Sequence, residues 1–258
     1  MRADKYFAEK YGSRTKAAEA IEKGLVLVGG KPIRTKDEVR ETDVITFLQA
    51  EQNFVSNGGY KLARAIEMFG FSCKDKVFVD IGASTGGFTD CLLQNGAAKV
   101  YAVDVGESLL HESLVGSEKI VRMENTNARY LTKDDFPEQI DAVVTDVSFI
   151  SLRLIFPAIK SILGELGEAF VLIKPQFECE KKNIGKSGIV HPSAHAQIVK
   201  KVLDFAEENG LYPFGIVNAP VRKGKNIEYV LHIKAKRAGA LSAAQTVNTV
   251  QRFLQEMK

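Results

Sequence analysis

A glycine-rich turn that joins an apolar strand to a helix is the feature that most constrains the fold of this chain. The apolar run 77–81 is followed by Gly82, Gly86 and Gly87, and a helix is predicted over 87–94. Glycine lets the backbone turn sharply and approach a ligand without a Cβ in the way. A helix N-terminus adds unpaired N–H donors. The turn therefore predicts a small-molecule site at the end of a strand, with a glycine turn that holds no ligand as the alternative.

Strands and helices alternate along the chain after this turn. The runs that predict strands lie at 77–81, 100–103, 120–121, 142–145, 169–173, 212–217 and 228–233. Helical patterns lie at 59–69, 87–94, 152–163 and 194–208. Repeated β–α units predict an α/β, doubly wound, Rossmann-like sheet that is mainly parallel. Because a short loop joins the last two runs, the final strand is expected to be antiparallel.

The N-terminal residues follow a different pattern from the rest. Two short helices are predicted at 2–10 and 14–23, with Ser13 as the N-cap of the second helix. A hairpin over 25–33 and a strand at 44–48 complete a small α+β unit. A helix is also predicted near the C-terminus. The expected division is a small domain at 1–50, a linker at 51–57, a large domain at 58–236 and a helical tail at 237–258.

Positive charge is concentrated at the N-terminus. Residues 1–36 carry nine Lys or Arg and four acidic residues, a balance of +5, whereas the whole chain has a net charge of +3. Such asymmetry predicts a module that faces a polyanion, nucleic acid first and a membrane surface second. A solvated basic helix face is the alternative.

The loop 176–191 is interpreted as a basic lid or as a plain mobile loop. The predicted RNA contacts are Arg2, Lys5, Arg14, Lys16, Lys23, Lys31, Lys182 and Lys186.

Cysteine, histidine and apolar patterns argue against several classes of protein. The three cysteines show no CxxC spacing and the four histidines are scattered, so neither a disulfide framework nor a metal site is expected. The apolar stretches are too short to span a bilayer. The N-terminus lacks the apolar core of a signal peptide. We therefore expect a cytoplasmic protein with reduced thiols and no membrane association.

The spacing of the glycine turn indicates which ligand it suits. Its glycines form neither the GxGxxG pattern of dinucleotide enzymes nor a P-loop. Asp104 ends the second predicted strand, where an acid typically binds the ribose hydroxyls of an adenine nucleotide. A phosphate-free ligand with an adenosine and a carboxylate suits this arrangement, and S-adenosylmethionine fits that description. The predicted cofactor contacts are Asp80, Gly82, Ala83, Ser84, Thr85, Gly86, Gly87, Phe88, Asp104 and Asn127.

Two lysines and two acids are expected to meet at one rim of the sheet. Asp146 and Lys174 directly follow predicted strands. Glu228 begins the last strand, and Lys61 opens the helix after the linker. Methyl transfer to a weakly acidic ribose 2′-hydroxyl needs such a set, because a neutral lysine amine can take the proton while acids orient the charged groups. Each residue alone is more often a solvated surface charge.

Several strings resemble known families. Residues 13–31 resemble the αL RNA-binding motif, and residues 80–90 resemble methyltransferase motif I. The order Lys61, Asp146, Lys174 and Glu228 resembles the Lys-Asp-Lys-Glu tetrad of FtsJ-type RNA 2′-O-methyltransferases. Together with the N-terminal motif, residues 1–235 resemble the TlyA family, whose members are labelled hemolysin A or rRNA (cytidine-2′-O)-methyltransferase.

This resemblance implies a methyltransferase that uses S-adenosylmethionine and modifies the ribose of a cytidine in ribosomal RNA. It also implies that Lys174 is the general base and that the partner is ribosomal RNA or a ribosomal subunit. Two other functions stay open. The first is a non-catalytic RNA-binding assembly factor that keeps the methyltransferase fold. The second is the cytolysin suggested by the hemolysin label, which the missing membrane signals disfavour.

Three further residues near strand ends have two interpretations each. Phe149 either stacks on the target base or belongs to the core, where an apolar strand-end residue is more common. Asn127 and Arg129 either line an adenine pocket or satisfy local turn groups.

Overall fold

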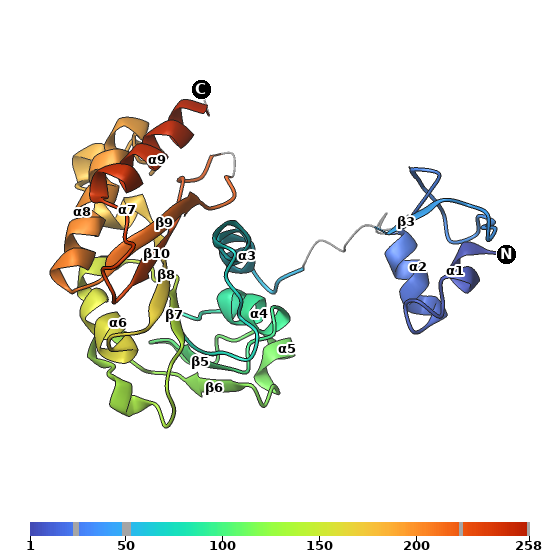
Figure 1. Cartoon of the computed structure of the whole chain (residues 1–258), viewed down its shortest axis with the longest axis horizontal. Helices are drawn as coiled ribbons and strands as arrows, with labels where there is room; N and C mark the ends of the chain where they lie inside the picture. The colour runs from blue at the N-terminus through green and yellow to red at the C-terminus, as the bar shows by residue number, and fades with distance from the viewer. Residues whose placement is uncertain (23–25, 48–52, 222–223, 257–258) are drawn as a thin grey trace. The chain divides into compact units, whose positions relative to one another are not determined.

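The chain forms two compact units, Met1–Asn53 and Phe54–Lys258 (Figure 1). The computed structural model describes residues 1–22, 26–47, 53–221 and 224–256. The division between the units falls inside the predicted linker 51–57. Lys23, one of the predicted RNA contacts, lies outside the described residues.

The small unit combines two helices with a three-stranded antiparallel sheet of order β2-β1-β3. A tight turn joins β1 to β2, and its two glycines, Gly29 and Gly30, have φ of +58° and +77°. Such positive values match the turns that suit the twist of a hairpin. Apolar residues from both helices and from β1 form its core, including Phe7, Ile21 and Val26. The elements are α1 (Ala3–Tyr6), α2 (Arg14–Glu22), β1 (Val26–Val28), β2 (Lys31–Pro32) and β3 (Ile45–Phe47).

The first predicted helix, 2–10, is longer than the observed one. Helix α1 ends at Tyr6, and turns continue to Gly12, whose φ of +76° is incompatible with a right-handed helix. The hydroxyl of Ser13 accepts the N–H of Lys16 at 3.2 Å, which confirms the predicted N-cap of α2.

A seven-stranded sheet forms the centre of the large unit, in the order β6-β5-β4-β7-β8-β10-β9. Neighbouring strands are parallel except at β10, which is antiparallel to both β8 and β9. The predicted doubly wound α/β class and the antiparallel last strand are therefore confirmed. The strands are β4 (Val77–Ile81), β5 (Lys99–Val103), β6 (Ile120–Met123), β7 (Ala142–Thr145), β8 (Glu168–Ile173), β9 (Tyr212–Asn218) and β10 (Tyr229–Lys234).

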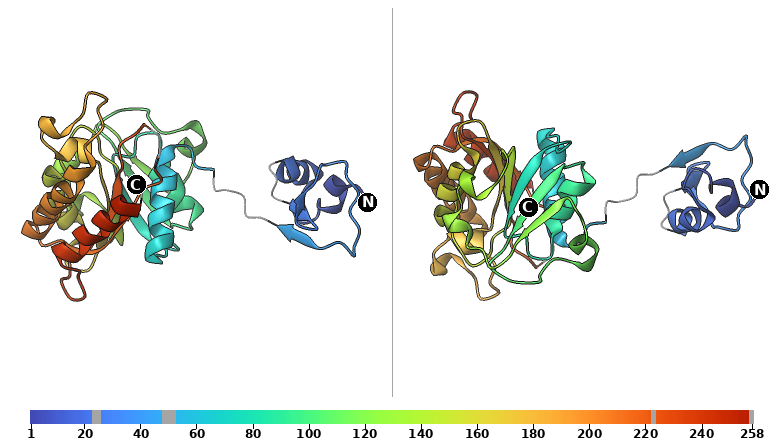
Figure 2. Two further views of the ribbon diagram at one scale, coloured as in Figure 1. Left: turned by 90° about the horizontal axis from the view of Figure 1, so that it is seen from above. Right: turned by 90° about the horizontal axis from the view of Figure 1, so that it is seen from below.

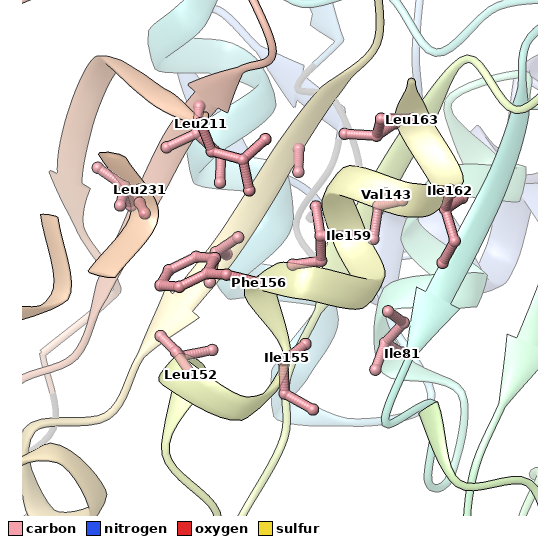
Figure 3. Close-up of a cluster of buried hydrophobic side chains, with 14 of the residues drawn as sticks. Ile81, Val143, Leu152, Ile155, Phe156, Ile159, Ile162, Leu163, Leu211 and Leu231 are labelled. Atoms are coloured by element: carbon pink, nitrogen blue, oxygen red, sulfur yellow. The ribbon is translucent and has the colours of Figure 1, made fainter. Parts of the chain in front are cut away.

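Helices cover both faces of this sheet (Figures 1 and 2). On one face, α3 (Asn57–Phe69) and α4 (Gly87–Gln94) bury Leu62 and Leu92 against the strands. The other face carries α6 (Phe156–Leu163), α8 (His195–Glu208) and α9 (Ala243–Glu256). Figure 3 shows part of the apolar cluster on this second face, which includes residues of α6 and strand residues such as Ile81 and Leu231.

Short helices complete the large unit. Two are α-helical, α5 (Glu112–Val115) and α7 (Pro175–Glu178). The others are 3₁₀ turns, which are common as connectors. They are η1 (Ala128–Tyr130), η2 (Lys133–Asp135), η3 (Leu152–Leu154), η4 (Lys181–Asn183) and η5 (Pro192–Ala194).

The structure corrects several predicted boundaries. The helix predicted over 152–163 divides at Ile155 into η3 and α6, and Pro157 stands in the first turn of α6, where the ring is tolerated. Strand β10 begins at Tyr229, so Glu228 precedes it by one residue. The helix predicted near the C-terminus is α9, and it buries Val250 in the core of the large unit.

The topology creates a crevice at the carboxyl end of β4. The chain passes from β4 to β5 and β6 on one side, and later returns to β7 and β8 on the other side. Open α/β sheets bind ligands at such a switch point. The glycine turn, Asp104 and Asp146 all follow strands that end there.

Candidate active site

The glycine turn after β4 packs closely against neighbouring segments at two positions where a side chain would not fit. Gly82 has φ of +82°, and a Cβ placed on it would lie 3.0 Å from the carbonyl oxygen of Asp146. A Cβ on Gly87 would lie 2.1 Å from the Ser56 hydroxyl oxygen. Real Cβ atoms avoid such distances, so both positions require glycine unless the neighbouring segments move.

Asp80 lies behind this turn and does not line either of the cavities described below. Its side chain is fully buried, and one carboxylate oxygen accepts the hydroxyl of Thr89 at 2.7 Å. Burial raises the pKa of Asp80 to about 7, against the effect of that hydrogen bond, and the Asp146 and Asp104 carboxylates add to the rise. Asp80 therefore joins β4 to α4, and direct contact with a cofactor stays a prediction.

Asp104 faces the larger of two adjoining cavities. Its carboxylate accepts the backbone N–H of Ser84 and that of Gly106, each at 2.9 Å. The cavity has a volume of about 700 Å³, and its lining includes Asp104, Asn127 and Gly82 together with apolar side chains such as Leu109. The amide oxygen of Asn127 accepts the backbone N–H of Arg129, so it also has a local partner. A cavity that combines apolar side chains with a carboxylate suits an adenosine.

The second cavity, of about 140 Å³, lies beneath the glycine turn. It shares Gly82, Ser84, Asp146 and Ser148 with the larger cavity, so the two adjoin. A ligand with an adenosine and an amino-acid portion could therefore extend from one cavity into the other. The remaining lining residues are Ser56, Gly58, Ala83, Thr85, Gly87, Phe88 and Lys174.

The four predicted catalytic residues form one row of ion pairs, of which Asp146 and Lys174 line the small cavity. Lys174 Nζ lies 2.5 Å from Asp146 Oδ1, and Lys61 Nζ lies 3.7 Å from Asp146 Oδ2. Lys61 Nζ also lies 2.7 Å from Glu228 Oε2. Opposite charges thus alternate along the row, and Asp146 is the member that contacts both lysines. All four side chains are largely buried, and Lys174 is 9% exposed.

Ser148 and Ser56 line the same cavity, and neither was among the predicted site residues. The ammonium of Lys174 donates to the Ser148 hydroxyl at 2.7 Å. Ser148 stands two residues after Asp146, and that position was its only sequence signal. Ser56 was assigned to the linker, and its place beside Gly87 depends on how α3 packs on α4.

Phe149 lies at the mouth of the larger cavity, and the core interpretation of this residue was wrong. Its side chain is 91% exposed, and its backbone has φ of +61°. The ring lies 5.0 Å, centroid to centroid, from that of Phe177. An exposed aromatic residue with strained backbone is uncommon unless the surroundings fix it.

The loop 176–191 contains short elements of regular structure. It contains α7 and η4, and Ile184 and Val190 form an isolated antiparallel bridge. Lys182 pairs with Glu180 at 2.8 Å, which raises the pKa of Lys182. Lys186 is exposed.

The predicted RNA contacts of the small unit that lie among the described residues are exposed, but two of them share an acid. The Arg2 and Arg14 guanidinium groups lie 3.0 Å and 2.8 Å from the carboxylate of Asp4, which is buried. The side-chain hydrogen bond from Arg2, together with Arg14, lowers the pKa of Asp4. The predicted contacts Lys5, Lys16 and Lys31 are exposed, as are two further lysines of this unit, Lys10 and Lys36.

The described residues hold neither a metal cluster nor a membrane-spanning helix. Among them, no cluster of three or more His, Cys, Asp or Glu side chains has the arrangement that would hold a metal ion. Within the same part of the chain, no helix combines the length and the apolar character required to cross a membrane.

Substitution of Gly82 tests whether the turn holds the predicted donor. Gly82→Ala is expected to weaken S-adenosylmethionine binding at least about tenfold, because the new methyl group meets the Asp146 carbonyl and displaces the turn. Isothermal titration calorimetry measures the affinity. Gly70→Ala is the matched control, since Gly70 also has positive φ but has no atom within 4 Å of its Cβ position. Equal affinities in both variants would contradict this use of the turn.

Comparison with known proteins adds independent information. Residues 54–235 match the FtsJ-like methyltransferase family, and residues 1–45 match the S4 domain. Hemolysin A of Brachyspira hyodysenteriae is 40% identical over 90% of this chain and 99% of its own length. The 16S/23S rRNA (cytidine-2′-O)-methyltransferase TlyA of Mycobacterium tuberculosis is 38% identical over 95% of this chain and 92% of its own length. A solved structure from Streptococcus thermophilus, named for hemolysin, has a TM-score of 0.71 and 34% identity and covers 99% of this chain and 97% of that chain.

Proposed function

Because this chain belongs to the FtsJ-like methyltransferase family, we propose that it transfers a methyl group from S-adenosylmethionine to a ribose 2′-hydroxyl of structured ribosomal RNA. A cytidine is the proposed target, as in the relative from Mycobacterium tuberculosis. The observation that carries the proposal is the convergence of Lys61, Asp146, Lys174 and Glu228 beside the small cavity.

The two cavities fit the two parts of this donor. Asp104 and the apolar lining of the larger cavity would hold the adenosine, and the backbone of the glycine turn would approach the amino-acid portion. Gly82 and Gly87 allow the turn to pack closely against Asp146 and Ser56, which line the same small cavity. When bound, S-adenosylmethionine supplies a methyl group that is already activated on a sulfonium. The protein then needs only to position the acceptor and to remove one proton.

Lys174 is the proposed general base. In its neutral form its amine accepts the proton of the 2′-hydroxyl as the oxygen attacks the methyl carbon. The ammonium that forms would face Asp146 Oδ1, which lies 2.5 Å from the lysine nitrogen. Asp146 thus stabilises the charge that the proton transfer creates, in the manner of an acid that orients a catalytic base. Ser148 fixes the direction of the amine through its hydroxyl.

Lys61 and Glu228 orient the other side of the row. Glu228 pairs with Lys61 at 2.7 Å, which leaves the lysine 3.7 Å from Asp146 and aligns it with the acceptor site. The exposed Phe149 ring offers a face on which the target base can stack, a mode that single-stranded RNA recognition commonly uses. The S4 domain and the exposed Lys182 and Lys186 would contact phosphates around the target.

Replacing the proposed base tests the reaction directly. Lys174→Ala should lower methyl transfer by about 10²–10⁴-fold, because the alanine cannot take the proton. The assay measures tritium incorporation from labelled S-adenosylmethionine into ribosomal subunits and into free ribosomal RNA. Lys160→Ala is the control, since Lys160 lies on α6, donates to the Gly164 carbonyl and the Glu165 carboxylate just beyond that helix, and lines neither cavity. Undiminished incorporation in Lys174→Ala would contradict the assigned base.

The same preparation separates the enzyme from a non-catalytic assembly factor. The wild-type chain is expected to bind S-adenosylmethionine in a calorimetric titration and to methylate one of the two RNA substrates. Failure to bind the donor at millimolar concentration would support the assembly factor and overturn the proposed reaction.

The basic residues of the S4 domain are expected to set RNA affinity without affecting the donor. Lys16→Ala combined with Lys31→Ala should weaken ribosomal RNA binding and reduce the slope of log affinity against log salt by about one per lost phosphate contact. Filter binding at several salt concentrations measures both quantities. Lys119→Ala, an exposed change in the large unit, is the control. A slope that matches the control would show that these two lysines make no phosphate contact.

A further inference from the structure

Glu178 is a buried acid whose carboxylate is fully engaged at the edge of the candidate site. Glu178 is the last residue of helix α7, and it is 4% exposed. One carboxylate oxygen accepts the Ser151 hydroxyl at 2.7 Å, and the other accepts the backbone N–H of Leu152, also at 2.7 Å. Burial raises the pKa of Glu178, and the two hydrogen bonds work against that rise.

These two bonds connect the segments that carry the candidate catalytic groups. Ser151 ends the loop that begins at Asp146 and includes Ser148 and Phe149. Helix α7 begins directly after Lys174, which is its N-cap residue. Glu178 is therefore a cross-link between the loop after β7 and the helix after β8.

Two other contacts also join the loop after β7 to the segment 174–178, and both belong to the candidate site. The ammonium of Lys174 donates to Ser148, and the ring of Phe177 packs against that of Phe149. Each contact is lost if the loop 147–151 moves away from α7. Their geometry thus depends on whatever holds the two segments together.

The backbone of this loop needs such a restraint. Phe149 has φ of +61°, a conformation that a bulky residue rarely adopts unless neighbouring contacts fix it. Its ring is exposed, so burial of the side chain does not supply the restraint. The bonds that Glu178 makes to Ser151 and Leu152 lie two and three residues further along and can supply it.

We propose that Glu178 is a positioning residue, which holds the loop 147–151 against α7 and so places Ser148 and Phe149 for the RNA acceptor. This inference rests on the proposed methyl transfer, because it assigns the loop to the acceptor side of that reaction. Glu178 does not touch the reacting atoms; it acts through Ser148 and Phe149. The competing interpretation is that Glu178 only caps η3 and contributes to stability.

A fluorescence reporter separates these two interpretations. The chain contains no tryptophan, so Phe149→Trp introduces a single indole on the loop in question. In that background, Glu178→Ala is expected to lower the fluorescence anisotropy of the indole, because the loop is released from α7. Glu178→Gln should largely preserve the anisotropy, since an amide can accept from Leu152 and donate to Ser151.

Asp141→Ala is the control for loss of a carboxylate that accepts a backbone N–H from a distant segment. Asp141 accepts the backbone N–H of Val77 at 2.8 Å, at the amino end of the sheet. This variant should change neither the anisotropy nor the rate. Ser151→Ala, which removes only one of the two bonds, gives an intermediate change and remains informative if Glu178→Ala does not fold.

Kinetics in the otherwise wild-type chain complete the test. Glu178→Ala should lower kcat on ribosomal RNA on the order of 10²-fold, because the acceptor is misplaced. The affinity for S-adenosylmethionine should fall by a smaller factor, because the loop 147–151 lines only part of the larger cavity and Asp104 stays in place. Glu178→Gln should restore most of the rate. Unchanged anisotropy together with unchanged kcat in Glu178→Ala or Ser151→Ala would overturn the proposal. So would equal losses of stability, donor affinity and rate in both the alanine and glutamine variants.

The proposed function and this inference can fail separately. Absence of methyl transfer by the wild-type chain would refute the reaction, whereas the anisotropy measurement would still decide whether Glu178 orders the loop. An active wild-type chain with an unrestrained loop in Glu178→Ala but undiminished kcat would leave the reaction intact and refute the positioning role.

Discussion

The carboxylate of Asp146 holds two lysines that enter the site from different parts of the fold. Lys174 follows β8 and Lys61 belongs to α3, and the two nitrogens lie 2.5 Å and 3.7 Å from the Asp146 oxygens. Opposite charges about 4 Å apart near a protein surface attract by about 4 kcal/mol. Without Asp146, two partly buried ammonium groups would face each other. Glu228 completes the row and balances its charge.

The directions of the surrounding strands bring three residues of this row to one edge of the sheet. Parallel pairing of β4, β7 and β8 brings the glycine turn, Asp146 and Lys174 to one edge of the sheet. The reversed direction of β10 brings Glu228 to the same edge, although it is distant in sequence. Glu178 then joins the loop after β7 to the helix after β8. The same residues that complete the fold would therefore define the acceptor side of the proposed site.

The sequence predicted those contacts of the site that follow from strand order, and it missed those that depend on tertiary packing. The convergence of Asp146 and Lys174 could be predicted, because the carboxyl ends of neighbouring parallel strands meet. The exposure of Phe149 could not, since an apolar residue after a strand has the same pattern whether it lies in the core or at a rim. Glu178 gave no signal either, because its partners lie about 26 residues earlier and are defined only by tertiary packing. Asp80 was predicted from its motif, yet its contacts are with Thr89 rather than with the cavity.

A crystal structure with S-adenosylhomocysteine bound tests the central claim most directly. The account predicts the adenosine beside Asp104 and the sulfur above the small cavity. A ribose hydroxyl placed for attack would then lie about 3–3.5 Å from the methyl position and within reach of Lys174 Nζ. A bound product whose sulfur points away from Lys174, or whose binding separates Lys174 from Asp146, would contradict it.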